Sequence, residues 1–159
     1  MDFRIGHGYD VHPLAQGLPM WLCGIRIDSP AGFVAHSDGD VAIHALCDAL
    51  LGARAMGDIG KLFPDSSPEW KGIDSKILLK KVISVVCSDG WSLSNADITI
   101  ALQAPKIGPH IAQMRSCLAS VMGVEADRIS VKATTTERLG FVGRGEGCEV
   151  WASVMLVKL

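Results

Sequence analysis

Apolar residues recur at strand-like spacing in several parts of this chain. Runs rich in β-branched and other apolar residues predict strands at 3–8, 20–27, 95–103, 129–133 and 148–159. Gly24 interrupts the second run, which indicates a tight hairpin or a bulge, and residues 29–32 are typical of a turn. The last run is apolar on both faces, so we expect it to be buried on both sides, with another subunit as one candidate cover.

A helix is expected after the turn residues that follow position 35. Ser37 followed by Asp40 resembles a capping box, which predicts a helix that runs to about Arg54. Asp40, His44 and Asp48 recur at every fourth position and form a polar stripe. A solvated helix face is the ordinary explanation of such a stripe. The apolar face comprises Ile43, Leu46, Cys47, Leu50 and Leu51.

Two further helices follow the same reasoning. One should begin at residue 74 or 75 and end near 89–90. Pro109 fits the first turn of the other, which should run to residue 122 and stop at Gly123. The resulting order of elements predicts an α+β domain: a mixed β-sheet with helices packed on one face, plus a small β-hairpin, in a ferredoxin-like or chorismate-mutase-like arrangement.

Length and composition narrow the class of protein. The 159 residues suit a single domain over 1–159, and no apolar run is long enough to span a bilayer. No basic segment followed by an apolar stretch opens the chain, so we expect a cytoplasmic protein without a membrane partner. The net charge of −2, with no basic stripe, argues against a nucleic-acid partner. Reduced, buried thiols are expected at Cys23, Cys47, Cys87, Cys117 and Cys148.

Asp10 and His12 suggest part of a metal site. In an extended strand, residues two apart point to the same side, so this carboxylate and imidazole can converge on one zinc ion. A catalytic zinc usually has three protein ligands, and His44 on the predicted helix can supply the third. A metal-bound histidine usually donates its other N–H to a carboxylate or carbonyl, and Asp40 or Asp48 can serve here. The alternative is that Asp10 and His12 only cap a turn before Pro13.

Two long loops carry polar groups and glycines. The segment 56–68 is either a connector or a loop whose backbone approaches a ligand closely. The segment 134–147 contains three consecutive threonines, Glu137 and four glycines, which makes an ordinary strand or helix unexpected. Its hydroxyls and amides suit a phosphate, and Glu137 suits a hard cation such as Mg²⁺, although a flexible hairpin loop is also compatible with the sequence.

Together these motifs resemble the 2-C-methyl-D-erythritol 2,4-cyclodiphosphate synthase family. The likeness spans essentially the whole chain and rests on the segments 4–12, 36–44, 57–65, 103–106 and 132–147, in the family's order. The resemblance implies a homotrimer with active sites between adjacent subunits. It implies zinc on Asp10, His12 and His44, and a second divalent cation, Mg²⁺ or Mn²⁺, on Glu137.

The resemblance also implies roles for the remaining polar segments. His36 and Thr135 look like catalytic residues that stabilise the transition state, Asp58 and Gly60 would hold the ribose, and the segment 102–108 would form the cytidine pocket. The substrate-binding set implied in this way comprises Asp10, His12, His36, Ser37, Asp58, Ile59, Gly60, Phe63, Pro64, Asp65, Ser66, Ser67, Leu102, Pro105, Lys106, Ile107, Gly108, Thr134, Thr135, Thr136, Glu137, Phe141 and Arg144.

One departure from the family pattern lies near the end of the chain. The usual pattern has two more residues after Gly147, whereas Cys148 and Glu149 follow here at once. In the family, Arg144 and its neighbours border a cavity on the threefold axis that can hold an isoprenoid diphosphate. The shorter link alters the expected shape of that cavity.

The resemblance implies a phosphorus–oxygen lyase of non-mevalonate isoprenoid biosynthesis. Such an enzyme converts 4-diphosphocytidyl-2-C-methyl-D-erythritol 2-phosphate to 2-C-methyl-D-erythritol 2,4-cyclodiphosphate and releases CMP, as the 2-phosphate attacks the β-phosphorus. Two other classes share parts of the pattern: a metallophosphatase that uses zinc-bound hydroxide, and a non-catalytic sensor or carrier of isoprenoid diphosphates.

Overall fold

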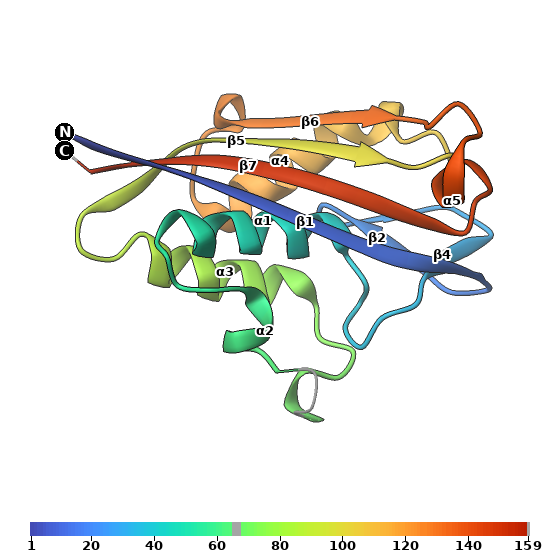
Figure 1. The fold of residues 1–159 in the computed structure, drawn as a ribbon, viewed down its shortest axis with the longest axis horizontal. Helices are drawn as coiled ribbons and strands as arrows, with labels where there is room; N and C mark the ends of the chain where they lie inside the picture. Colours follow the sequence, from blue (N-terminus) through green and yellow to red (C-terminus); the bar gives the residue numbers. More distant parts are fainter. Residues whose placement is uncertain (65–67, 159) are drawn as a thin grey trace.

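A five-stranded mixed sheet forms the centre of the molecule (Figure 1). The computed structural model describes residues 1–64 and 68–158. From one edge to the other, the sheet is built from β4 (Ala31–Phe33), β1 (Asp2–Gln16), β7 (Gly147–Lys158), β5 (Trp91–Ala101) and β6 (Ile129–Thr134). Strands β5 and β6 run parallel and the other neighbours antiparallel, as a mixed sheet requires.

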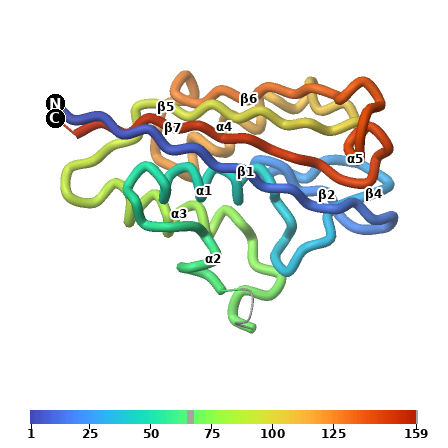
Figure 2. Tube along the Cα trace, viewed as in Figure 1, coloured from blue at the N-terminus to red at the C-terminus, as the bar shows by residue number. Residues whose placement is uncertain are grey.

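The first and last strands pair along almost their entire length. Their register runs from Asp2 opposite Lys158 to Pro13 opposite Gly147, so the two chain ends lie side by side (Figure 2). Strand β1 is therefore longer than the predicted 3–8, and Asp10 and His12 lie inside it rather than in a turn. Strand β7 begins at Gly147, so the point after Gly147 where the usual pattern has two more residues lies inside this strand.

The interrupted run 20–27 is the predicted hairpin. Strands β2 (Met20–Leu22) and β3 (Ile25–Ile27) pair antiparallel across a turn in which Cys23 and Gly24 have φ values of 51° and 79°. Two successive positive φ values are typical of two-residue hairpin turns, whose backbone twist matches the right-handed twist of the two strands that they join. The turn predicted at 29–32 is wrong in part, because β4 begins at Ala31 and pairs with the end of β1.

Three longer helices cover one face of the sheet, as predicted (Figure 1). They are α1 (Val41–Ala53), α3 (Ser75–Val86) and α4 (Ile111–Met122). Gly123, with φ of 69°, ends α4 as its sequence position indicated. The described residues contain no helix with the length and apolar character needed to cross a membrane. Short helices occur at α2 (Ile59–Leu62), η1 (Pro68–Trp70), η2 (Gly108–His110), η3 (Ala126–Arg128) and α5 (Gly140–Gly143).

Asp40, and not Ser37, caps α1, which corrects the capping-box prediction. Its carboxylate is fully buried and accepts the backbone N–H groups of Ile43 at 3.0 Å, Cys23 at 3.0 Å and Gly24 at 2.7 Å. Burial raises the pKa of Asp40, although these N–H donors act in the opposite direction. Asp40 therefore joins the hairpin turn to the start of α1 and does not belong to a solvated stripe.

Strand β1 and helix α1 contact each other backbone to backbone at two glycines. A Cβ atom on Gly6 would lie 1.8 Å from the carbonyl oxygen of Ala49, and one on Gly8 would lie 1.9 Å from that of Ala45. No side chain fits at either position without a shift of the helix. This contact sets the separation between the strand that carries Asp10 and the helix that carries His44.

In the described residues, none of the three longer helices covers the opposite face of the sheet. Apolar side chains of β1 point outward there, among them Ile5, which is 73% exposed, and Phe3, which is 56% exposed. The outward residues Trp151, Met155 and Val157 of β7 are only half-buried. One face of β7 is thus buried within this chain. That a second subunit covers its other face stays a prediction.

Candidate metal centre and substrate site

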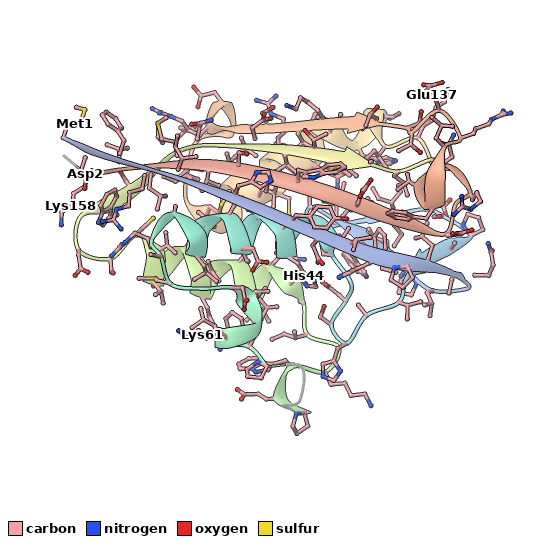
Figure 3. The ribbon with its side chains drawn as sticks, viewed as in Figure 1. Met1, Asp2, His44, Lys61, Glu137 and Lys158 are labelled. Carbon is pink, nitrogen blue, oxygen red and sulfur yellow. The ribbon has the colours of Figure 1, made fainter. Side chains whose placement is uncertain are left out.

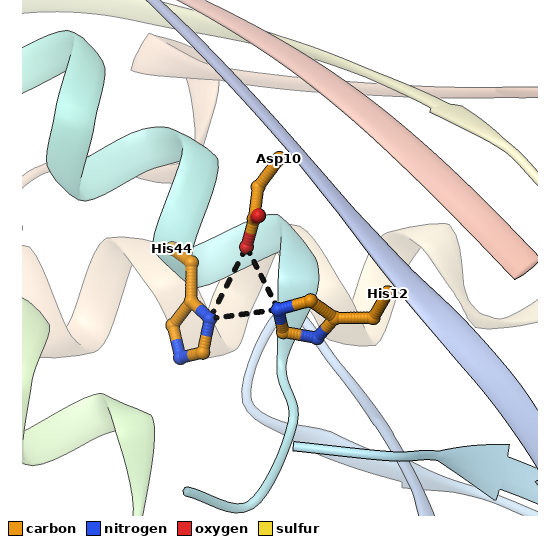
Figure 4. A group of neighbouring side chains, drawn as sticks. All are labelled: Asp10, His12 and His44. Atoms are coloured by element: carbon orange, nitrogen blue, oxygen red, sulfur yellow. Dashed lines mark hydrogen bonds and ion pairs between the residues drawn. The ribbon is translucent and has the colours of Figure 1, made fainter. Parts of the chain in front are cut away.

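Asp10, His12 and His44 converge as the sequence predicted (Figure 4). The Oδ2 atom of Asp10 lies 3.0 Å from Nε2 of His12 and 3.3 Å from Nδ1 of His44. The two imidazole nitrogens are 3.4 Å apart. The strand supplies the first two side chains from one side, and the first turn of α1 supplies the third.

The spacing of these three atoms suits zinc. Tetrahedral zinc with bonds of about 2.0–2.1 Å places its nitrogen and oxygen ligands about 3.3–3.4 Å apart. The three observed separations, 3.0, 3.3 and 3.4 Å, fit that triangle closely. Two imidazoles and one carboxylate are also a donor set that zinc prefers, and such a set leaves a fourth position for a ligand.

Local electrostatics favour a charged carboxylate in this centre. Burial alone would raise the pKa of Asp10, but its close contacts with the imidazoles of His12 and His44 hold it well below its usual range. Burial likewise opposes a charge on His12, yet the hydrogen bond to Asp10 raises the pKa of His12 on balance. His12 Nδ1 donates to the carbonyl oxygen of Gly39 at 2.9 Å, which leaves Nε2 directed at the centre.

The partner of the second His44 nitrogen differs from the prediction. An adjacent aspartate of the helix was expected, but Asp40 faces the hairpin and Asp48 accepts the N–H of Ile59 at 2.7 Å. Nε2 of His44 instead lies 3.0 Å from the hydroxyl of Ser75 and 3.2 Å from that of Ser37. Ser75 was missed because it is 31 residues away along the chain and carries no motif of its own.

A cavity of about 280 Å³ opens beside the three candidate ligands. The cavity is lined by several residues of the substrate-binding set that the family resemblance implies: His36, Ser37, Ile59, Gly60 and Phe63. Residues that the sequence did not single out also line it: Val34, Ala35, Trp70, Ile73 and Leu78. Asp58 caps α2 by accepting the N–H of Lys61 at 3.0 Å, and Pro64 lies outside the lining. The predicted residues Asp65, Ser66 and Ser67 lie outside the described residues.

The other predicted substrate residues form a second cluster, at the ends of β5 and β6. The N–H of Leu102 donates to the carbonyl of Thr134, and the N–H of Arg138 donates to the Gln103 side chain. The predicted cytidine segment, Leu102, Pro105, Lys106, Ile107 and Gly108, thereby lies beside the threonine loop, Thr134, Thr135 and Thr136. Phe141 lies in α5, and the exposed Arg144 after it pairs with Glu146 at 2.7 Å.

Glu137 does not approach the three candidate zinc ligands within one chain. Figure 3 shows Glu137 at the upper right, past the end of the edge strand β6, and His44 below the sheet. The backbone of Glu137 has a φ of 53°, and its carboxylate accepts the Thr135 hydroxyl at 3.3 Å. The described part of the chain therefore presents two separate groups of predicted site residues.

Comparison with known proteins relates the chain as a whole to one family. The YgbB family model matches residues 3–157. A 2-C-methyl-D-erythritol 2,4-cyclodiphosphate synthase of Pseudomonas fluorescens is 56% identical over 155 residues, which cover 98% of this chain and 99% of the relative.

Solved structures agree with this match. A 2C-methyl-D-erythritol-2,4-cyclodiphosphate synthase in a CDP-bound form aligns with a TM-score of 0.89 and 42% identity over 97% of this chain and 100% of its own. The bifunctional IspDF of Campylobacter jejuni aligns with a TM-score of 0.95 and 43% identity over 99% of this chain, which spans 43% of that longer chain.

Proposed function

This chain belongs to the YgbB family, and from that premise we propose that its 2-C-methyl-D-erythritol 2,4-cyclodiphosphate synthase activity depends on a zinc centre formed by Asp10, His12 and His44. The activity makes it a phosphorus–oxygen lyase of the non-mevalonate isoprenoid pathway. The observation that carries the proposal is the convergence of these three ligand atoms beside a cavity lined by His36 and Ser37.

The reaction requires one anion to attack another. The 2-phosphate of 4-diphosphocytidyl-2-C-methyl-D-erythritol 2-phosphate attacks the β-phosphorus, and CMP leaves as the cyclic diphosphate closes. Zinc on the three ligands would supply positive charge to a β-phosphate oxygen and so lower the repulsion. No acid–base residue is needed, because the nucleophile is already ionised and CMP leaves as an anion.

The cavity contributes by ordering a flexible substrate. Positioning of reacting groups is worth up to about 7–11 kcal/mol in favourable cases. In our proposal His36 and Thr135 stabilise the transition state, and Ser37 lies near the methylerythritol. Glu137 holds a second divalent cation, Mg²⁺ or Mn²⁺, whose preferred oxygen ligands match this loop.

We place each active site between adjacent subunits of a homotrimer. This arrangement is supported by the distance in one chain between the zinc ligands and the cluster of Thr135 and Glu137, and by the apolar sheet face that carries Ile5. A second subunit that covers this face can bring the cytidine segment of one chain to the cavity of the next. A cavity on the threefold axis, near Arg144, would then be open to an isoprenoid diphosphate.

A trimer should be visible in solution. Analytical ultracentrifugation at micromolar concentration is expected to give three times the chain mass of 16.9 kDa. Ile5→Asp, on the apolar sheet face, should shift the protein toward monomer, whereas Ile77→Asp, at a 48% exposed position on α3, should leave it trimeric. A monomeric wild-type protein would contradict the shared-site proposal.

A cytoplasmic location belongs to the same proposal. All five cysteines are free thiols, and three of them, Cys23, Cys47 and Cys148, are buried. Free thiols of this kind are usual in a reducing compartment. The substrate and both products are charged phosphates, so the enzyme must share a compartment with the reactions before and after it.

Product analysis tests the proposed function directly. The protein is incubated with the substrate, zinc and Mg²⁺, and the reaction is followed by phosphorus NMR. CMP and cyclodiphosphate should form in equal amounts without oxygen from labelled water. Release of inorganic phosphate carrying solvent oxygen would indicate a metallophosphatase, and binding without turnover would indicate a carrier; either result would contradict the proposal.

A further inference from the structure

A chain of hydrogen bonds runs from His44 away from the metal centre to a carboxylate. Nε2 of His44 lies 3.0 Å from the Ser75 hydroxyl, and that hydroxyl donates to Oδ1 of Asp38 at 2.5 Å. We infer that Ser75 and Asp38 are positioning residues that hold His44 in the tautomer whose Nδ1 lone pair faces the metal. This inference deepens the proposed function and rests on its zinc centre.

The direction of each hydrogen bond follows from the groups involved. An ionised carboxylate only accepts, so the Ser75 hydroxyl hydrogen points to Asp38. The Ser75 backbone N–H donates to the other carboxylate oxygen at 2.9 Å, which holds Asp38 in this orientation. The Ser75 oxygen can then offer His44 only a lone pair, and Nε2 must carry the hydrogen. In the neutral ring, Nδ1 is consequently left bare.

The hydroxyl is also held rigidly in place. Ser75 is fully buried and is the first residue of α3, which Asp74 caps. The loop that carries Asp38 is bound to the same region, because the Asp38 N–H donates to the Ile73 carbonyl at 3.1 Å. A fixed neighbour of this kind orients a metal-binding imidazole more strongly than a mobile one.

Ser37 cannot fulfil the same role. Its oxygen lies 3.2 Å from Nε2 of His44 and accepts the Gly39 N–H at 3.2 Å. No carboxylate receives its hydroxyl hydrogen in the described residues, so this hydroxyl can rotate and act as donor or acceptor toward His44. The choice of tautomer therefore depends on Ser75.

Both candidate histidine ligands are oriented from the same short loop. His12 donates from Nδ1 to the Gly39 carbonyl, and His44 donates through Ser75 to Asp38, the preceding residue. Residues 38–39 thus direct one ring to bind through Nε2 and the other through Nδ1. This pairing explains how two unlike imidazole nitrogens point at one centre.

The tautomer can be measured without metal. Two-bond ¹H–¹⁵N correlation spectra of the metal-free protein, at a pH where the rings are neutral, should show His44 mainly as the Nε2–H tautomer, although Oδ2 of Asp10, 3.3 Å from Nδ1, favours the other one. Ser75→Ala removes the hydroxyl oxygen that accepts the Nε2 hydrogen of His44. Asp38→Asn leaves one side-chain oxygen at residue 38, although the hydroxyl and the backbone N–H of Ser75 each need an acceptor there. Both variants should show the Nδ1–H tautomer as well. Ser84→Ala, an exposed serine of the same helix, should match the wild type.

Zinc affinity supplies the second readout. Competition with a chelator is expected to give zinc binding about 10–100-fold weaker in Ser75→Ala and Asp38→Asn than in wild type and Ser84→Ala, with similar thermal unfolding for all four. Because Asp38→Asn is nearly isosteric, it remains informative if Ser75→Ala does not fold.

The two readouts separate this inference from the proposed function. An unchanged His44 tautomer in both folded variants would overturn the inference, even if zinc binds. A wild-type protein that binds no zinc but shows the expected change of tautomer would support the hydrogen-bond assignment and overturn the zinc centre instead.

Discussion

His12→Ala is expected to lose zinc and CMP release together. The change leaves Asp10 and His44 as two ligands, which are too few to hold zinc tightly. Since loss of a supporting hydrogen bond alone costs about 10–100-fold in metal affinity, loss of a ligand should cost more than about 100-fold. Metal analysis and CMP release are measured on the same preparation. His7→Ala, on the same strand but on its exposed face, should retain its zinc.

Glu137→Gln should separate the two metals. Glu137 lies in an oxygen-rich loop away from His12 and His44, so this variant should keep its zinc while turnover falls sharply. Added Mg²⁺ or Mn²⁺ should restore part of the turnover, which it should not do for His12→Ala. Loss of zinc from Glu137→Gln, or full activity without Mg²⁺, would refute the assignment of two metals to two sites.

Gly8→Ala is expected to destabilise the fold strongly. The new Cβ would lie 1.9 Å from the Ala45 carbonyl oxygen and 2.7 Å from the Ala49 backbone nitrogen, so the helix must move away from the strand. Overpacking of a side chain costs about 1–3 kcal/mol, and a clash with the backbone of α1, which cannot rotate away as a side chain can, should exceed the upper value. Urea unfolding measures the decrease in the free energy of unfolding. This decrease should be a large share of the total free energy of unfolding, which is about 5–15 kcal/mol for a typical domain.

Gly52→Ala provides the matched control for Gly8→Ala. Gly52 lies in the same helix, and the atom nearest to its added Cβ is the His7 carbonyl oxygen at 3.9 Å. Alanine there should be neutral or stabilise by up to about 1 kcal/mol, because glycine disfavours a helix. Equal stability of Gly8→Ala and wild type would show that the contact between β1 and α1 is looser than the structure indicates.

Helices and hairpins whose ends are marked by a nearby proline or glycine were predictable from the sequence. Pro109 lies in the short helix η2 directly before α4, Gly123 ends α4, and both residues act within one turn of the chain. The β2–β3 hairpin was predictable for the same reason, because Gly24 permits the positive φ of its turn. Strand β4 was not predictable, since its short run of three residues is extended only because β1 lies beside it.

The first turn of α1 shows where local reasoning fails. Ser37 and Asp40 are both good capping residues, and nothing in their spacing distinguishes them. The choice of Asp40 depends on the hairpin amides of Cys23 and Gly24, which the fold brings to its carboxylate. Tertiary contacts decide such cases, and the same contacts turn Asp40 away from His44.

The candidate metal site was predictable because two of its ligands share a strand. Asp10 and His12 are related by the period of two, and His44 was the histidine flanked by acids. Ser75 and Asp38 were not predictable, because no periodicity connects residues on a loop and at the start of a later helix. The distance between Glu137 and His44 could also not be inferred, since it depends on the order of strands in the sheet.

The position of β7 between β1 and β5 has a consequence for biosynthesis. Asp10 and His12 lie in the first described strand, but β7, which holds β1 in register, follows all the other described strands and helices along the chain. Contacts between strands so far apart in the sequence cannot form until β7 has left the ribosome, and they form slowly. In the proposed zinc centre, Asp10 and His12 are therefore held in register only after β7 has joined the sheet, and a chain truncated before β7 should bind the metal more weakly.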